Sequence, residues 1–393
     1  MSETSQALKN LRAFAIVTVV SFHSVLAYLT SQPALPHPFD SPPYNWMATP
    51  ILDNARWFGF DLFAAFQYAS LMNFMFFLSG VFVWPSLTRK GSFRFLYERL
   101  RRIGVPFVLG VALLMPVAYY PVYRVTALDP SVTAFIEHWL ALPFWPSGPL
   151  WFLWQLIALD VIATCLYAAA PRAGTVLSRF SASAGDFPGR YFLGLLAISA
   201  VAYLPLSLAF GASRWSNFGP FALQPDRPLL YLVYFFAGVG VGAHGYDRGL
   251  LRAGGMLAQR WYVWLAGTLA TFLLWLASMA PAFYGHRGVV VELGSSIALV
   301  LVIATSCLCL AAMALRFATA RFAVIDSLAE NAYAIYLVHY VFVVWLQYAL
   351  LGAALPAIAK AAIVFGGALM LSWTVTATYA RLPLRVRPVR AKA

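Results

Sequence analysis

The sequence predicts an all-α, polytopic integral membrane protein with about ten transmembrane helices, and three observations support this fold class. First, 62% of the 393 residues are hydrophobic and only 10% are charged, whereas about a quarter of an ordinary soluble domain is charged. Second, the apolar residues gather in runs of about 20, which is the length a helix needs to cross roughly 30 Å of hydrocarbon. Third, the basic residues concentrate in alternate connecting segments. Lipid must therefore cover most of this chain.

The apolar runs place helices along nearly the whole chain. The first run, 13–29, is long and lacks a small-x-small cleavage site, so we interpret it as a retained helix rather than a signal peptide. The apolar stretch before the second helix starts too early for one helix, and we assign residues 51–66 to an interfacial segment. With no repeat or linker in view, residues 1–393 form a single transmembrane domain. The predicted helices are 12–30, 67–86, 104–121, 149–170, 191–210, 229–246, 261–280, 289–315, 326–351 and 356–380.

The distribution of Lys and Arg predicts that both termini are cytoplasmic. In this orientation 21 of the 27 basic residues lie in cytoplasmic segments, six of them in a basic loop at 87–103, and Lys360 lies inside the last helix. Because the charge lines one membrane face, the net charge of +13 does not indicate a nucleic-acid partner. The outside segments hold Arg56, Arg124, Arg214, Arg227 and Arg287.

The three cysteines lie in apolar runs. This pattern gives neither a disulfide framework nor a zinc site, and no metal is expected. The cysteines are Cys165, Cys307 and Cys309.

His23 is the strongest candidate for chemistry, because an ionisable side chain inside a membrane is costly and usually functional. Arg12 lies eleven residues earlier on the same predicted helix. Eleven residues make about three turns plus 20°, so both side chains share a face, and His23 lies about 16 Å beyond Arg12, near the midplane. An imidazole there can accept a proton from a hydroxyl, and the arginine can bind a phosphate at the entrance. The alternative is a structural histidine with a snorkelling arginine.

His339 is predicted at a similar depth. Ser327 and Glu330 resemble a capping box that starts the ninth helix on the cytoplasmic side, which places His339 roughly 18 Å along it. Tyr336 lies one turn earlier on the same face. The pair can belong to the catalytic site, where it would orient the acceptor or an oxyanion, or it can simply hold helices together.

The densest charge cluster lies at 89–102. Arg99 and Arg102 share a helical face directly before the next helix and can bind a phosphorylated donor. The alternative is contact with anionic lipid headgroups.

Further polar residues lie within predicted helices. Asp160 can orient a histidine or pair with an arginine, and Glu292 near a helix end is more simply solvated. Asn73 and Ser79 can hydrogen-bond in the second helix, where the Ser79-Gly80 pair also suits close helix packing. The string at 240–245 matches G-x-G-x-x-G, but no strand precedes it, so a dinucleotide site is rejected.

Taken together, these residues resemble the family-3 membrane acyltransferases of bacteria. The matches recur in the family's order along nearly the whole chain. They are Leu11-Arg12-Ala13 through His23 (Arg-x10-His), Phe76-Phe77-Leu78-Ser79-Gly80, Arg99-x-x-Arg102 with Pro106, Leu150-Trp151-Phe152-Leu153, and Tyr333-Ala334-Ile335-Tyr336-Leu337-Val338-His339.

The resemblance implies transfer of an acyl group from cytoplasmic acyl-CoA, acetyl-CoA or succinyl-CoA, to a sugar hydroxyl on the outer side of the inner membrane. It implies that His23 is catalytic and that Arg12, Arg99 and Arg102 help bind the donor. We assign Asn73, Ser79, Trp151 and Asp160 to substrate binding. Many members carry an acidic residue where this chain has Asn73. With the basic segment at 99–106, this departure resembles the branch that succinylates osmoregulated periplasmic glucans.

Two other classes remain open. A secondary transporter also has midplane polar residues and Gly- or Pro-interrupted helices, but the chain shows no repeat and its polar residues gather towards one basic mouth. A non-catalytic scaffold for envelope polymer assembly predicts no acyl-CoA binding and tolerance of changes at His23 and Arg12.

Overall fold

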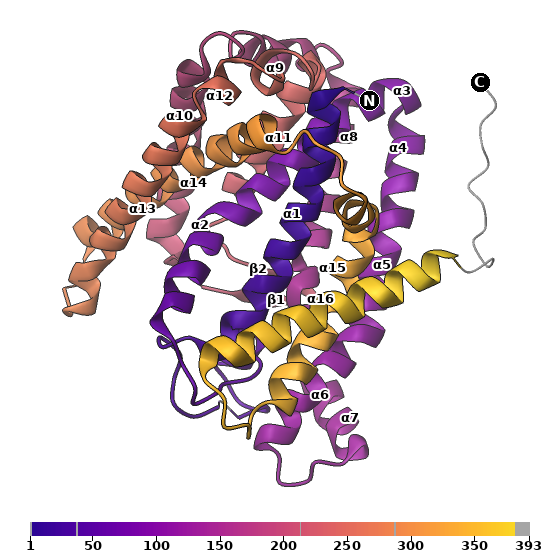
Figure 1. Cartoon of the computed structure of the whole chain (residues 1–393), viewed down its shortest axis with the longest axis vertical. Coiled ribbons are helices and arrows are strands. Elements are labelled where there is room, and N and C mark those ends of the chain that lie inside the picture. The colour runs from indigo at the N-terminus through magenta and orange to yellow at the C-terminus, as the bar shows by residue number, and fades with distance from the viewer. Residues whose placement is uncertain (1, 37, 213, 287, 382–393) are drawn as a thin grey trace.

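The computed structural model describes residues 2–36, 38–212, 214–286 and 288–381, which form a bundle of helices with one short hairpin (Figure 1). Arg287 and the basic residues beyond 381 lie outside the described residues. The hairpin pairs β1 (Ser216–Phe218) with β2 (Phe221–Leu223) antiparallel, with Asn217 opposite Ala222. The helices are α1 (Glu3–Val25), α2 (Phe58–Val81), α3 (Val83–Lys90), α4 (Ser92–Arg99), α5 (Val105–Leu109), α6 (Met115–Thr126), α7 (Val132–Ala141), α8 (Trp151–Ala169), α9 (Ala173–Ala182), α10 (Pro188–Phe210), α11 (Pro228–His244), α12 (Met256–Gln259), α13 (Trp261–Phe283), α14 (Val289–Phe317), α15 (Ala323–Ala349) and α16 (Ala357–Arg381).

The predicted polytopic, all-α fold is confirmed. Within the described ranges, nine helical segments are long and apolar enough to cross a membrane. The predicted helix at 229–246 is not among these nine. It corresponds to α11, which is apolar but has only 17 residues.

Helix α11 packs against α2 with almost no space between the two backbones. A side chain at Gly238 or Gly242 would overlap the carbonyl oxygen of Phe77 or Val81, and one at Gly80 would overlap that of Phe235. The glycine-rich string at 240–245 therefore contributes to helix packing, and Gly80 has the close-packing role expected of it.

Two predicted connecting segments are more helical than expected. Residues 51–57 contain no helix, but the other part of the predicted interfacial segment, from Phe58, is the beginning of α2. The expected basic loop at 87–103 is helical except at Gly91, which has a positive φ of 75°. Arg, Lys and Glu favour helices, and Glu98 pairs with Lys90 and with Arg94, the latter at 3.1 Å. Helix α4 continues into a π-helical segment at Leu100–Gly104.

Two apolar cores hold the bundle together, and α1 contributes to both. Val20 of α1 packs in the core formed with α6, α8, α15 and α16. Leu11 of the same helix packs in the core formed with α10, α11, α13 and α14. Figure 1 shows α1 running downward through the centre of the molecule, between these two sets of helices. The helix that carries Arg12 and His23 is therefore held from two sides.

Candidate active site

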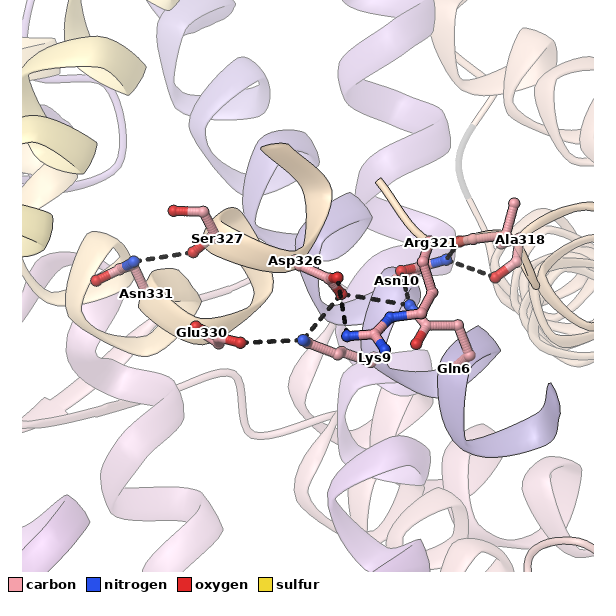
Figure 2. Close-up of polar contacts among 10 residues, drawn as sticks. Gln6, Lys9, Asn10, Ala318, Arg321, Asp326, Ser327, Glu330 and Asn331 are labelled. Carbon is pink, nitrogen blue, oxygen red and sulfur yellow. Dashed lines mark hydrogen bonds and ion pairs between the residues drawn. The ribbon is translucent and has the colours of Figure 1, made fainter. Parts of the chain in front are cut away.

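The beginnings of α1 and α15 are joined by a cluster of polar side chains, shown in Figure 2. Lys9 Nζ lies 2.8 Å from Asp326 Oδ1 and 3.0 Å from Glu330 Oε1. Asn10 donates to the carbonyl oxygens of Ala318 and Ala320 at 2.6 and 2.8 Å. Lys9 and Asp326 precede His23 and His339 by 14 and 13 residues, so this cluster aligns the two histidines along their helices.

The capping box predicted for the ninth helix is wrong. Helix α15 begins at Ala323, so Ser327 and Glu330 lie inside it. The Ser327 hydroxyl accepts from Trp373 Nε1 at 3.1 Å, and its carbonyl oxygen accepts from Asn331 at 2.9 Å. Glu330 pairs with Lys9 instead of turning back to a helix end.

His23 and His339 are in direct contact. His339 Nε2 lies 3.2 Å from His23 Nδ1, and the ring centroids are 5.1 Å apart. His339 is fully buried and His23 is partly exposed. His23 lies in the last turn of α1, two residues before the helix ends at Val25, and not at the middle of a helix as expected. The difference arises because α1 starts at Glu3, nine residues before the predicted start.

The hydrogen bonds around the two rings determine where each neutral ring carries its proton. His339 Nδ1 lies 2.7 Å from the Tyr336 carbonyl oxygen. A carbonyl oxygen only accepts, so this Nδ1 donates and His339 Nε2 presents a lone pair. His23 Nδ1 faces that lone pair and the Val19 carbonyl oxygen at 2.9 Å. Both are acceptors, so His23 Nδ1 carries the proton and His23 Nε2 presents its lone pair.

Tyr336 supports this relay through its backbone and through its side chain. Its carbonyl oxygen accepts from His339, and its hydroxyl donates to the carbonyl oxygen of Pro149 at the entry to α8. Both polar groups of Tyr336 are thus engaged within the protein. Tyr336 and His339 thus reach His23 through one chain of hydrogen bonds, and their predicted part in catalysis stays a prediction.

A segment between α1 and α2 contacts Tyr340, a residue of α15 that packs against His23. Tyr340 lies edge-on to the His23 ring, with centroids 5.3 Å apart. The Met47 carbonyl oxygen accepts from Tyr119 at 2.8 Å and from Tyr340 at 3.5 Å. The same segment is fastened by a buried ion pair between Asp53 and Lys360, at 2.7 Å.

Sequence reasoning missed this segment, and it also missed Gln347. The Gln347 side chain donates to the carbonyl oxygens of His23 and Ser24 at 3.0 and 3.3 Å. The signal available for Lys360 was its place inside an apolar run, where a lysine needs a carboxylate partner.

The three arginines predicted to bind the donor converge. Arg12 lies within electrostatic range of both Arg99 and Arg102, and its guanidinium lies 5.0 Å from the centre of the Phe82 ring. The Tyr333 hydroxyl donates to the Arg102 carbonyl oxygen at 2.7 Å, which ties α15 to this cluster. Among the residues that the structure describes, neither Arg12 nor Arg102 pairs with a carboxylate. Three like charges held together favour an anionic ligand.

Asp160 is the acidic group at this end. It is fully buried, and its Oδ2 lies 3.4 Å from Arg99 Nε. Of the two alternatives left by the sequence, the structure therefore favours pairing with an arginine. Neither carboxylate oxygen has a hydrogen-bond donor in the described part of the protein.

One face of α2 is partly exposed from the arginine cluster onward. Met72, Met75, Ser79 and Phe82 recur every three or four residues and are partly exposed, whereas every residue between them is buried. The face starts at the Phe82 ring beneath Arg12 and extends about 15 Å, close to the ~16 Å between Arg12 and His23 along α1. On α1, Ile16 and Val19 lie between Arg12 and His23 on the same face. Both are buried in the protein, so this face of α1 offers no open path between the two residues.

The remaining predicted site residues are not all brought to this face. The Ser79 hydroxyl donates to the Met75 carbonyl oxygen at 2.8 Å. Asn73 is fully buried, and neither its nitrogen nor its side-chain oxygen has a partner among the described residues. Trp151 stacks on Tyr231 and meets Trp215 edge-on.

Gln155 is a further buried amide that sequence reasoning did not select. It lies in α8, five residues before Asp160, and its Nε2 has no acceptor within the described chain. Buried amides without partners are costly, so each calls for a ligand or a water molecule. Glu292, in contrast, is exposed as expected.

The predicted site residues all lie within the part of the chain that matches one known protein family. The model of a family described as an acyltransferase domain, acyltransferase 3, matches residues 5–377, which include every predicted site residue. Comparisons with curated proteins and with solved structures find no significant match. In the described ranges, no group of three or more His, Cys, Asp or Glu side chains is placed to hold a metal ion. The family match favours an enzyme over the transporter and scaffold alternatives. The chain therefore belongs to the acyltransferase 3 family and is a multi-pass membrane acyltransferase.

Proposed function

We propose that this chain is an O-acyltransferase of the bacterial inner membrane that uses cytoplasmic acyl-CoA to acylate a hydroxyl of a periplasmic or cell-surface glycan. The observation that supports it best is the relay from Tyr336 through His339 to His23. This relay leaves a lone pair at His23 Nε2, to which no described residue donates. O-acylation needs such a base, because the hydroxyl must lose its proton as it attacks.

The reaction proceeds at His23 Nε2. This nitrogen takes the acceptor's hydroxyl proton while the oxygen attacks the thioester carbonyl carbon. The C–S bond then breaks, and the proton passes from His23 to the departing thiolate, which leaves as free CoA. His339 stabilises the imidazolium through the hydrogen bond it accepts at Nε2. In an alternative route the same His23 nitrogen attacks the thioester itself and carries the acyl group to the hydroxyl.

The arginine cluster binds the phosphates of the donor. Arginine presents a planar fork of donors that matches phosphate oxygens, and three guanidinium groups suit a ligand with several phosphates. Asp160 holds Arg99 by its Nε at 3.4 Å, which leaves the terminal nitrogens for the ligand. We propose that this end faces the cytoplasm, in keeping with the excess of Lys and Arg expected there.

The pantetheine arm follows the partly exposed face of α2 from Phe82 to Met72. Methionine side chains are flexible and polarisable, and they suit a passage for a narrow chain. The arm carries two amide groups, and the Ser79 hydroxyl is the polar side chain on this face of α2 that can contact one of them.

The residue at position 73 bears on the identity of the acyl group. The amide at Asn73, where many members of the family have a carboxylate, favours the branch that succinylates osmoregulated periplasmic glucans. We therefore propose succinyl-CoA as the donor and acetyl-CoA as the alternative.

Two measurements test the proposal. Mass analysis of periplasmic glucans and surface glycans, from cells with and without the chain, should show a missing increment of 100 Da for succinyl or 42 Da for acetyl when the chain is absent. Purified protein in lipid vesicles should release CoA thiol from the matching donor only when the acceptor is present.

His23→Ala is the decisive variant, and His138→Ala is its matched control, because that histidine is exposed in α7 and pairs with Asp40. The first should abolish the increment while leaving folded protein in the membrane, and the second should not. A normal product from folded His23→Ala protein would overturn the proposal. Labelled donor without acceptor distinguishes the two routes, because only the acyl-histidine route leaves label on the protein.

A further inference from the structure

An apolar groove lies on the outer surface of the bundle, away from the histidine pair. It runs between the segment 100–109 and α8 and has a volume of about 600 Å³. The lining side chains are all apolar. They are Leu100, Val105, Phe107, Val108, Leu109, Trp154, Ile157, Ala158 and Phe221, with the backbone of Gly104 completing the wall.

The local structure explains why this space stays open. Two π-helical turns, Leu100–Gly104 and Gly110–Leu114, widen the helix on either side of α5. Such turns occur frequently at functional sites. Gly104 contributes no side chain, so the wall recedes between Leu100 and Ile157.

One end of the groove is closed by the β-hairpin. Phe221 stacks on Phe107 with centroids 6.1 Å apart and meets Trp154 edge-on at 5.6 Å. The indole of Trp154 donates to the carbonyl oxygen of Ala222 at 3.0 Å, which fixes the hairpin in this position. The hairpin thus closes one end of the groove, which extends about 14 Å from Leu100 to Leu109.

The other end of the groove carries positive charge. Arg101 precedes the lining residue Val105 by four residues, so it lies about one turn further along the same side of the helix. Its side chain is exposed, and no ion pair joins it to any residue that the structure describes. Arg99, in contrast, turns inward to Asp160. Arg101 is therefore not paired with Asp160, the carboxylate that binds Arg99.

We propose that this groove is a binding site for an anionic phospholipid, with one acyl chain in the slot and the phosphate at Arg101. The groove lies on a segment that is long and apolar enough to span a membrane. Its lining residues Val105 and Val108 are exposed by 52% and 62%, so the groove faces the lipid bilayer. A hydrocarbon chain suits walls without polar groups, and a basic residue at the membrane surface attracts an anionic headgroup.

Native mass spectrometry of the full chain, exchanged into mixtures of phosphatidylglycerol and phosphatidylcholine, tests the site. We expect one retained phosphatidylglycerol that survives mild delipidation. Arg101→Ala should weaken its retention about fivefold, the effect of ~1 kcal/mol for one basic residue near the surface. Arg260→Ala is the matched control, because Arg260 is exposed at the start of α13 and has no described ion pair.

A second pair of variants tests the slot. Ala158→Phe fills it and should abolish the retained lipid, whereas Ala270→Phe adds the same ring to the exposed face of α13 and should not. Equal retention by these two variants would overturn the proposal, and so would equal retention of the two lipids by the unchanged protein. Preference for a polyprenyl phosphate over phosphatidylglycerol would also overturn it, since the slot would then serve a lipid-linked substrate. None of these readouts requires acyl transfer.

Discussion

His339 Nε2 accepts a hydrogen bond from His23 Nδ1 across 3.2 Å, although the two residues are 316 positions apart in the chain. The contact makes one histidine the partner that sets the tautomer of the other. In a Ser-His-Asp triad a carboxylate holds the catalytic histidine in this way, whereas here the partner is a neutral imidazole ring.

The role of His339 can be separated from a merely structural one. His339→Gln keeps a carbonyl oxygen that can accept from His23 Nδ1 and an amide that can donate to the Tyr336 carbonyl oxygen, whereas His339→Leu keeps neither. We expect His23→Ala to lower kcat about 10²–10⁴-fold, His339→Leu to lower it by less, and His339→Gln to recover part of that loss. Steady-state release of CoA measures all three. Identical kcat values for the Gln and Leu variants would contradict a positioning role.

Asp160 should affect donor binding and not chemistry. Asp160→Asn removes the charge that orients Arg99, and we expect KM for acyl-CoA to rise about tenfold, equivalent to ~1.4 kcal/mol, with kcat nearly unchanged. Asp129→Asn is the control, because Asp129 is an exposed acid near α7. A fall in kcat at unchanged KM would show that Asp160 acts at the reacting atoms instead.

The face of α2 should be accessible to a polar thiol reagent. In a background lacking Cys165, Cys307 and Cys309, we expect Met75→Cys and Ser79→Cys to react with a methanethiosulfonate, and CoA to slow the reaction. Phe77→Cys is the control, because Phe77 is fully buried on the opposite side of α2. Labelling of all three at one rate, with no effect of CoA, would mean that the donor takes another path.

Removing one charge of the buried Asp53–Lys360 pair should destabilise the protein more than removing both charges. Lys360→Met leaves a carboxylate 2% exposed without its counter-ion, and such a loss costs about 3–5 kcal/mol. Asp53→Asn combined with Lys360→Met should restore most of the stability, because no buried charge remains. Thermal unfolding in detergent measures both. A double variant no more stable than the single one would contradict this account.

The cluster in Figure 2 should couple the starts of α1 and α15. In a double-mutant cycle of Lys9→Met and Asp326→Asn we expect a favourable coupling energy between the two side chains, which salt should weaken. The control cycle is Arg94→Met with Glu98→Gln, whose ion pair lies within α4. Both single variants at the α1–α15 cluster should also lower kcat, because the two histidines depend on this alignment, and the control variants should not.

The parts of the site that the sequence could predict are those that depend on local geometry. Arg12 and His23 lie on one helix, so the period of 3.6 residues is enough to place them on one face. Arg99 and Arg102 could be paired for the same reason. The contacts that no local pattern contains are those between helices, such as His23 with His339 and Asp53 with Lys360.

The errors have the same origin. Ser327 and Glu330 fit a capping pattern, but Glu330 binds Lys9 of another helix, and α15 begins five residues earlier than the pattern implies. The expected loop at 87–103 forms helix because its charged residues pair with each other along one face. The start of α1 was placed nine residues too late because its polar beginning, with Thr4 and Gln6 buried in the protein, carries no apolar signal.

The separation of the two histidines along the chain has a consequence for synthesis. At about 5–20 residues per second, α15 emerges from the ribosome roughly 15–60 s after α1. During that interval His23 is already in the bilayer without the partner that orients it. An unfinished polypeptide thus lacks the hydrogen-bond partner of His23 until its last helices have arrived.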